Sequence, residues 1–599
     1  MPGKSAKPKK DLAPPPDLAP APGITNRTIA ETMLEIAAML ELKGENRFKI
    51  QSYRRAADTL LNMPDDVRAI WRAGQLRDLP NVGEAISSKI DELLRTGRLA
   101  FYDRLRAEIP PGLIALTAIP DVGPKTALAL YEALGVDSVA ALAEALDAGR
   151  VATVPGFGPK SVEKLREGLA ALQQRPGDDR VLVSAARPLA ETLIDQLRAS
   201  GIPIHQIQPA GSLRRGRSTI GDVDILCTTP EPQQIIDFFV TLPLVDVVVG
   251  HGDRKSSVRL RNGLRVDLMV LPPEDYGALL HHFTGSREHN IQMRDRALNQ
   301  GLKLNEYGFT RPDGTHIACP EEVDVFRTLG LPWIPPELRE GTGEIAAAAA
   351  GRLPHLVTAD DIRGDLHNHS VWSDGTATIA EMARAARDRG YAYMALTDHT
   401  QSLTIARGLT VEQLWEQARE VAAVNAALAP FRVLHGVELE ICPDGTLDYP
   451  DEVLARLDIV VASVHQGLRQ DADRITERVL RACRNPHVDI IAHPTGQLLT
   501  GRAPSALDVD AVIAEARRTG TVLEINAAPE RLDLDDIYAR RAIEAGVLLA
   551  IDTDSHHPAG FANLTYGLAV ARRAWAQPSD ILNTRSLDHL LAWLAARGA

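Results

Sequence analysis

The spacing of apolar and polar residues divides the chain into three regions. From Thr25 onward, the segment IAETMLEIAAMLEL repeats apolar residues at intervals of three and four, which predicts helices, and short helices separated by Gly and Pro continue to about Gln174. Near Val181 the pattern changes to strands mixed with helices. After Asp361, short β-branched runs such as IVVASVH and VLLAID alternate with helical segments. This alternation favours an α/β barrel or a layered sheet.

Composition narrows the class of protein. Residues 1–23 are rich in Pro, Ala and Lys and predict a disordered tail, whereas the Gly/Ala-rich stretch 340–356 predicts a domain junction. Apolar residues make up 45% of the 599 residues, which excludes a fibre and a disordered scaffold. The start lacks the apolar core of a secretory signal, and no apolar run approaches the roughly 20 residues that cross a bilayer. The net charge of −13 would argue against DNA binding if the charge were spread evenly, so DNA binding must depend on local patches of positive charge.

The cysteines indicate the redox compartment. They are four, scattered, and never spaced as CxxC: Cys227, Cys319, Cys442 and Cys483. We interpret them as reduced thiols in a cytoplasmic protein.

A short pattern occurs three times in the helical region: LPNVGEAISSKI (79–90), IPDVGPKTALAL (119–130) and VPGFGPKSVEKL (154–165). In each copy a turn residue that suits positive φ (Asn81, Asp121, Gly156) precedes a glycine that allows close backbone approach (Gly83, Gly123, Gly158). The turn and the following helix N-terminus would face a phosphate, and Lys89, Lys125 and Lys160 would supply charge. The pattern resembles the helix-hairpin-helix motif, which grips DNA backbone without reading sequence; the alternative is three ordinary helix connections.

A second set of residues suits nucleotidyl transfer. Asp222 and Asp224 alternate on a predicted strand, so both carboxylates point to one face and can hold two metal ions. The segment 256–270 adds Asp267 on a strand after the Asn262-Gly263 hairpin turn. Ser212 and the backbone at Gly211 can cradle a triphosphate, and Arg215 can neutralise its charge.

This region resembles the palm of family X DNA polymerases, the family of DNA polymerase beta, and FTGSREHNIQMR (283–294) and LKLNEYGF (302–309) extend the match. The resemblance implies that Mg²⁺ or Mn²⁺ binds Asp222, Asp224 and Asp267, with Asp267 closest to the primer 3′-hydroxyl. It implies contacts to the incoming triphosphate from Gly211, Ser212, Arg215 and Gly221, and to its sugar from Phe283 and Gly285. Asn290 and Arg294 would probe the minor-groove side of the base pair and template, and Arg265 the primer end. His282 stands where the family commonly has Tyr, which leaves sugar discrimination open.

The amino-terminal region resembles the small lyase domain of the same family, through NRFKIQSYRRAADTL (46–60) and the first hairpin. The resemblance places Lys89 where active lyases carry a Schiff-base lysine, with Lys49, Tyr53 and Arg54 available for a 5′-phosphate pocket. Ala85 stands where a second basic residue often lies. The alternative is that Lys89 only contacts backbone phosphate.

The carboxy-terminal region carries acid and histidine motifs at the ends of apolar runs: DLHNHS (365–370), WSDG (372–375), LTDH (396–399), GVELE (436–440), ASVH (462–465), IAHP (491–494) and TDSH (553–556). His367 and His369 are two apart, so both imidazoles face one side, and Asp554 and His556 repeat that spacing. Donors of this kind without cysteine favour two or three Zn²⁺ or Mn²⁺ ions, and phosphoester hydrolysis.

These motifs resemble the polymerase and histidinol phosphatase (PHP) domain, a distorted (β/α)7 barrel with a trinuclear centre. The resemblance implies nine ligands, with Glu438 as a bridge between ions: His367, His369, Asp374, His399, Glu438, His465, His493, Asp554 and His556. In chains of this arrangement it also implies 3′–5′ exonuclease activity or a related 3′-end phosphoesterase activity.

Together these readings predict a multidomain α+β and α/β protein. The expected parts are a tail (1–23), a lyase-like helical domain (24–105), a helix-hairpin-helix fingers-type domain (106–175), a nucleotidyltransferase palm with a mixed sheet (176–270), a nucleotide-selection subdomain (271–335), a linker (336–360) and a PHP domain (361–599). We expect a monomeric gap-filling repair polymerase with a 3′-end nuclease, acting on gapped or 3′-recessed DNA with dNTPs and no membrane. The alternatives are a DNA-end scaffold with one vestigial centre and a small-molecule phosphatase.

Overall fold

The computed structural model describes residues 20–21, 24–63, 66–109, 113, 116, 122, 124–154, 157–158, 161–162, 164–166 and 180–597. The chain divides into two compact units, residues 1–179 and 180–599, and each is described by itself. Most of the predicted tail and parts of the second and third hairpins lie outside the described residues. No described helix has the length and apolar character needed to traverse a bilayer.

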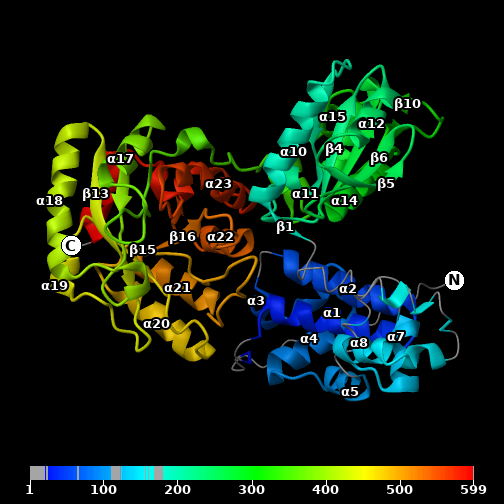
Figure 1. Ribbon diagram of the computed structural model, residues 1–599, viewed down its shortest axis with the longest axis horizontal. Helices are drawn as coiled ribbons and strands as arrows, with labels where there is room; N and C mark the ends of the chain where they lie inside the picture. The colour runs from blue at the N-terminus through cyan, green and yellow to red at the C-terminus, as the bar shows by residue number, and fades with distance from the viewer. Residues whose placement is uncertain are drawn as a thin grey trace, which may run out of the picture. The chain divides into compact units, whose positions relative to one another are not determined.

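The first unit is helical (Figure 1). Its helices are α1 (Asn26–Leu42), α2 (Arg47–Asn62), α3 (Val67–Arg72), α4 (Glu84–Thr96), α5 (Ala100–Glu108), α7 (Pro124–Leu134) and α8 (Val139–Asp147). Polar side chains begin several of them: Asn46 accepts from the N–H of Phe48, and Ser138 accepts from that of Ala141. The apolar faces meet in one core around Trp71, whose indole N–H donates to Asp91 over 2.7 Å.

The first hairpin turn has the predicted backbone. Asn81 adopts φ +63°, and Gly83 is the residue immediately before α4. A Cβ added at Gly83 or Gly158 would meet no atom within 4 Å, so the backbone there is open to an approaching group.

The second unit begins with a mixed five-stranded sheet in the order β2-β4-β7-β6-β5. The strands are β2 (Gln206–Pro209), β4 (Asp222–Thr228), β5 (Val245–His251), β6 (Lys255–Leu260) and β7 (Arg265–Val270), and the short pair β1 (Val181–Leu182) and β3 (Thr219–Ile220) lies apart from them. Helices α10 (Val183–Arg198) and α12 (Pro232–Val240) pack on the sheet, and α11 (Gly211–Arg214) precedes β3. Only β4 and β7 run parallel, in a register that places Asp224 beside Asp267.

The next segment packs around Phe309 and Phe326. It contains α13 (Tyr276–Thr284), α14 (Arg287–Asn299), α15 (Glu322–Thr328), α16 (Glu344–Ala349), β8 (Lys303–Asn305), β9 (Gly308–Thr310) and β10 (His316–Ile317). Part of the expected linker is folded into this core: Arg339, Glu340 and Glu344 are buried, and α16 contributes Ile345. The small side chains that suggested a domain junction instead allow close packing.

The remainder is a barrel of seven parallel strands in sequence order. They are β11 (Gly364–Asp365), β12 (Tyr393–Leu396), β13 (Arg432–Glu440), β14 (Ile459–Ser463), β15 (Ile490–Ile491), β16 (Val522–Asn526) and β17 (Leu549–Asp552). A parallel bridge between Asn368 and Ser555 joins the extensions of the first and last strands. The surrounding helices (Figure 1) are α17 (Ile379–Asp388), α18 (Val411–Leu428), α19 (Asp451–Leu454), α20 (Ala472–Arg484), α21 (Val509–Thr519), α22 (Asp536–Glu544), α23 (Leu564–Arg573) and α24 (Leu587–Arg597).

Candidate active sites

The barrel gathers the nine predicted ligands at the carboxyl ends of its strands. Eight of them fall into three groups whose donor atoms lie within 4.8 Å of one another: His369, Asp374, His399 and His556; His367, His369 and Asp554; His399, Glu438 and His465. The ninth, His493, places Nε2 3.0 Å from Glu438. Parallel strands bring these residues together because their carboxyl ends open on the same side of the barrel.

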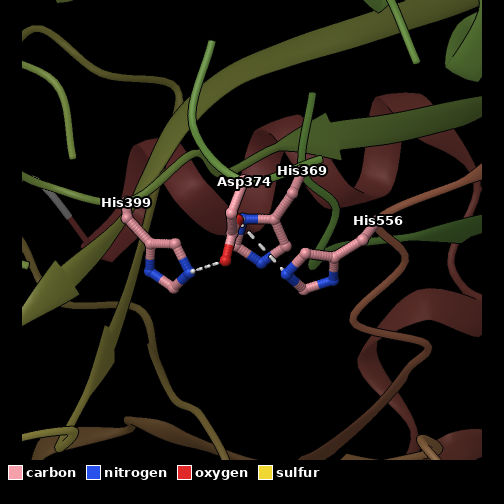
Figure 2. A group of neighbouring side chains, drawn as sticks. All are labelled: His369, Asp374, His399 and His556. Atoms are coloured by element: carbon pink, nitrogen blue, oxygen red, sulfur yellow. Dashed lines mark ion pairs between the residues drawn. The ribbon is translucent and has the colours of Figure 1, made fainter. Parts of the chain in front are cut away.

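Asp374 lies at the centre of the first group (Figure 2). One carboxylate oxygen is 3.3 Å from His556 Nε2, and the other is 3.4 Å from His399 Nε2. His369 stacks on the His556 ring with centroids 4.2 Å apart. Three imidazoles and one carboxylate therefore converge from three separate loops, because His369 and Asp374 both lie between β11 and α17.

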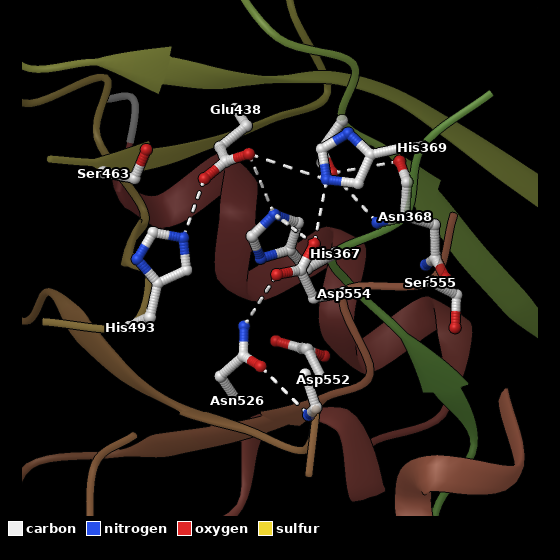
Figure 3. A network of polar contacts seen from close by, with 12 residues as sticks. His367, Asn368, His369, Glu438, Ser463, His493, Asn526, Asp552, Asp554 and Ser555 are labelled. Carbon is white, nitrogen blue, oxygen red and sulfur yellow. Dashed lines mark hydrogen bonds and ion pairs between the residues drawn. The ribbon is translucent and has the colours of Figure 1, made fainter. Parts of the chain in front are cut away.

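Glu438 connects the groups (Figure 3). The side chain is 1% exposed, and its two oxygens face different histidines: His399 Nδ1 at 2.9 Å and His367 Nε2 at 3.3 Å on one side, and His493 and His465 on the other. A carboxylate in this position can bridge two cations, which is the role that the resemblance to the PHP domain implies.

The donor set fits divalent cations. His367 Nε2 and the Nδ1 atoms of His369 and His399 are buried and make no hydrogen bond of good geometry to any described residue, although Glu438 lies 3.3 Å from the first and 2.9 Å from the third. The other nitrogen of His367 lies 2.7 Å from Glu524, and His465 Nδ1 lies 2.8 Å from Glu440. In these two histidines the carboxylate fixes the ring and leaves the remaining nitrogen for a metal.

Sequence reasoning did not find Glu524 and Glu440, although each is a carboxylate inside an apolar strand, VLEIN and GVELE. Arg531 was also missed. Its Nε lies 3.7 Å from Asp554, so a cationic side chain borders the cluster.

Burial and neighbouring charges set the imidazole protonation. Burial, His556 and His399 together lower the pKa of His369 to about 3. Burial also acts to lower the pKa of His399, but Glu438 and Asp374 outweigh it and raise the value to about 10. A cation that binds His399 must therefore displace a proton, so metal affinity depends on pH.

Two of the predicted ligands have strained backbones. His493 adopts φ +29° and Asp554 adopts φ +52°, in a region that residues other than glycine rarely occupy. Strain of this kind concentrates at functional sites, where the surrounding structure enforces it.

The palm brings together the three predicted aspartates. Asp222 and Asp224 share one face of β4, and Asp224 stands opposite Asp267 on β7. Burial, with the charges of Asp222 and Asp267, raises the pKa of Asp224 to about 7. Two cationic side chains contact Asp267: Lys255 Nζ lies at 2.9 Å and Arg265 Nε at 3.0 Å. Sequence reasoning did not find Lys255. The concentration of carboxylates suits cation binding.

The predicted triphosphate loop lies against these aspartates. Gly211 adopts φ +61°, and a Cβ there would be 2.6 Å from Asp224 Oδ2. Ser212 follows in α11. Arg215 donates to the carbonyl of Thr284 over 2.8 Å and pairs with Glu340. Gly221 directly precedes Asp222, and a Cβ there would be 3.2 Å from Arg180.

The predicted sugar and base contacts lie around the end of α13 and the start of α14. The Asn290 amide donates to the carbonyl of His282 over 2.7 Å, and its oxygen accepts from no described residue. A Cβ at Gly285 would be 2.8 Å from that oxygen. Phe283 packs edge-on to His282. Burial and the charge of Arg294 lower the pKa of His282.

In the first unit, Lys89 is half-buried among aromatic rings. Its Nζ lies 4.8 Å from the centroid of Phe101 and 5.9 Å from that of Tyr53. Burial, and then the charge of Lys49, lowers the pKa of Lys89. Arg54 pairs with Glu41. Of the other hairpin residues, Gly123, Lys160 and the side chain of Lys125 lie outside the described part of the chain.

Comparisons with known proteins match separate regions of the chain to known families. Family models match a helix-hairpin-helix domain over residues 24–99, a SAM-like helix-hairpin-helix tandem over 113–171, the DNA polymerase beta thumb over 279–340 and the PHP domain over 365–528. The DNA polymerase/3′-5′ exonuclease PolX of Bacillus subtilis is 40% identical over 571 residues, which are 95% of this chain and 99% of the relative. The chain belongs to the PolX family of DNA polymerases. The predicted family and fold class are confirmed.

More distant relatives match parts of this PolX chain. DNA polymerase lambda of Rattus norvegicus is 26% identical over 354 residues, 53% of this chain and 56% of the relative. A probable phosphatase of Thermoanaerobacter sp. (strain X514) is 31% identical over 232 residues, 37% of this chain and 89% of the relative. Polymerase and PHP proteins generally use divalent cations, and helix-hairpin-helix domains imply DNA binding.

Proposed function

We propose that this PolX chain fills short gaps in DNA at the palm and trims 3′ ends at the PHP centre. The observation that carries the proposal is the presence of two separate acidic clusters in one chain: three aspartates on β4 and β7, and nine acid and histidine side chains in the barrel. The first suits phosphodiester formation and the second phosphodiester hydrolysis.

At the palm, Asp222, Asp224 and Asp267 would hold Mg²⁺ or Mn²⁺, which when bound would neutralise phosphate charge during in-line displacement. The residues of the chain position the triphosphate and the metal-binding carboxylates. Gly211 and Ser212 form the cradle for triphosphate oxygens, and Arg215 offsets their charge. Lys255 and Arg265 fix the carboxylate of Asp267, which lies closest to the primer 3′-hydroxyl in this assignment.

At the barrel, the nine ligands would hold two or three Zn²⁺ or Mn²⁺ ions, which when bound would activate water and stabilise the leaving oxygen. Glu524 and Glu440 orient His367 and His465. Arg531 attracts the scissile phosphodiester to the rim of the cluster. The substrate we propose is the 3′ end of gapped or 3′-recessed DNA.

We further propose a 5′-deoxyribose-phosphate lyase activity at Lys89. A nucleophilic lysine must be neutral, and both burial and Lys49 lower the pKa of Lys89 in that direction. Lys49 and Tyr53 lie on α2 beside it, where a 5′-phosphate would bind.

Extension of a primer across a one-nucleotide gap, together with metal analysis of the purified chain, tests the main proposal. We expect incorporation that depends on Mg²⁺ or Mn²⁺ and two or three metal ions per barrel. The absence of incorporation by intact protein would favour a DNA-end scaffold.

A second candidate for the barrel is a small-molecule phosphatase, since the Thermoanaerobacter relative is described as a probable phosphatase. Competition between histidinol phosphate and a 3′-recessed duplex distinguishes the two. Preferential hydrolysis of the small phosphate would contradict the nuclease assignment.

A further inference from the structure

One buried carboxylate links the polymerase palm to the nuclease barrel. Glu340 is 9% exposed and is shared by three arginines. Arg215 Nε lies 2.9 Å from Oε1, Arg217 Nη2 lies 2.9 Å from Oε2, and Arg573 Nη1 lies 2.7 Å from Oε1. Arg215 and Arg217 follow α11 in the palm, whereas Arg573 ends α23 of the barrel. The pKa of Glu340 is held well below its usual range by these arginines, although burial opposes them.

Arg573 also holds the backbone of the palm loop. The same Nη1 donates to the main-chain carbonyl of Arg215 over 3.2 Å. Its Nη2 pairs with Asp536, at the first residue of α22, over 2.6 Å. The Arg573 side chain is 4% exposed, so both terminal nitrogens of its guanidinium are held at buried positions.

The loop packs directly on α23. Gly216 adopts φ +67°, and a Cβ added there would be 2.9 Å from the Cβ of Ala569 on that helix. No side chain therefore separates the palm loop from the barrel helix at this point. Close apposition of this kind lets a barrel residue define where the loop lies.

The charges in this cluster make the position of Arg215 sensitive to Arg573. All three arginines are attracted to Glu340, and they repel one another. Removal of Arg573 removes its repulsion of Arg215 and its hydrogen bond to the Arg215 carbonyl, so the Arg215 side chain is held more strongly by Glu340 while its backbone is held less. On the other side, Arg215 directly follows α11, whose first residue Gly211 lies against Asp224.

We propose that Arg573, in the nuclease barrel, is a positioning residue for nucleotide binding at the polymerase palm. It holds Arg215 through Glu340 and through the Arg215 carbonyl. This inference rests on the proposed role of Arg215 as a triphosphate contact. The nuclease domain is then part of the polymerase's nucleotide site, and removing its α23 contact weakens dNTP binding.

Steady-state gap filling by the full chain tests the proposal. The variant is Arg573→Met, which keeps the length of the side chain and removes its charge. We expect the KM for dNTP to rise about tenfold, within the range of coupling between contacting residues, with kcat and exonuclease activity within about twofold of the parent. The matched control is Arg541→Met, because Arg541 is similarly buried but pairs with Asp510 inside the barrel. A KM for Arg573→Met equal to that of the control overturns the proposal.

Two further variants separate the possible failures. Arg215→Met tests the role of Arg215: a raised KM there with an unchanged KM in Arg573→Met rejects only the coupling. An unchanged KM in both rejects the Arg215 assignment and the inference together. If Arg573→Met does not fold, Arg573→Lys is compared with Arg541→Lys. A lysine keeps the charge, but its single ammonium group cannot reproduce the contacts of the guanidinium with Glu340, Asp536 and the Arg215 carbonyl. We expect the KM for dNTP to rise in Arg573→Lys; a KM equal to that of Arg541→Lys overturns the proposal.

Discussion

The replacement Gly211→Ala tests the geometry of the polymerase centre at a turn of the proposed triphosphate cradle, without removing a proposed functional side chain. Gly211 adopts φ +61°, so an alanine there costs about 1–2 kcal/mol of backbone strain. The new Cβ would be 2.6 Å from Asp224 Oδ2. Relief to an ordinary contact of about 3.4 Å requires a shift of about 0.8 Å in a proposed metal ligand. We expect polymerase turnover to fall about 10- to 100-fold, since misplacement by about 1 Å has that effect.

The control for this variant is Gly201→Ala. Gly201 also lies in the palm and adopts φ +79°, but a Cβ there meets no atom within 4 Å. Both variants therefore carry similar backbone strain, and only one displaces Asp224. The assay is steady-state extension across a one-nucleotide gap, with exonuclease activity and thermal unfolding measured alongside. Equal polymerase activity in the two variants would refute the reasoning that Asp224 and the Gly211 turn form one centre.

Three other outcomes are expected. Glu524→Gln removes the carboxylate that lies 2.7 Å from His367 Nδ1. Exonuclease activity should fall about 10- to 100-fold while gap filling is retained. Unchanged exonuclease activity would show that Glu524 does not orient His367. Lys89→Ala should abolish borohydride trapping on a 5′-deoxyribose-phosphate. Because burial and then the charge of Lys49 lower the pKa of Lys89, Lys49→Ala should move the pH profile of trapping to higher pH. A parent protein that is never trapped would reject the lyase proposal. DNA affinity measured by fluorescence anisotropy should fall steeply as salt rises, because phosphate contacts release counterions, and a flat response would contradict binding through the hairpin backbone.

The sequence predicted the residues whose positions follow from strand geometry. Most of the nine predicted barrel ligands lie at or just after the ends of apolar strands, and parallel strands bring such ends together regardless of their distance along the chain. Asp267 was found because Asn262-Gly263 marks a hairpin that returns the strand beside β4. The positive φ of Asn81 followed from local turn chemistry.

Sequence reasoning missed the contacts that arise only from tertiary packing. Glu524 lies 157 positions from His367, and Glu340 lies 233 positions from Arg573, and no periodic pattern connects either pair. Lys255 resembles any surface lysine until β6 pairs with β7 and brings it to Asp267. The segment 336–360 was interpreted as a linker from its Gly and Ala content, whereas its buried charges find partners only in the folded unit.

Polymerase and exonuclease activities measured on the same duplexes for Asp222→Ala and His367→Ala test the central claim most directly. The account predicts that Asp222→Ala loses nucleotide addition and keeps 3′-end hydrolysis, and that His367→Ala does the reverse. Loss of both activities in either folded variant would contradict the division of the chemistry between two centres.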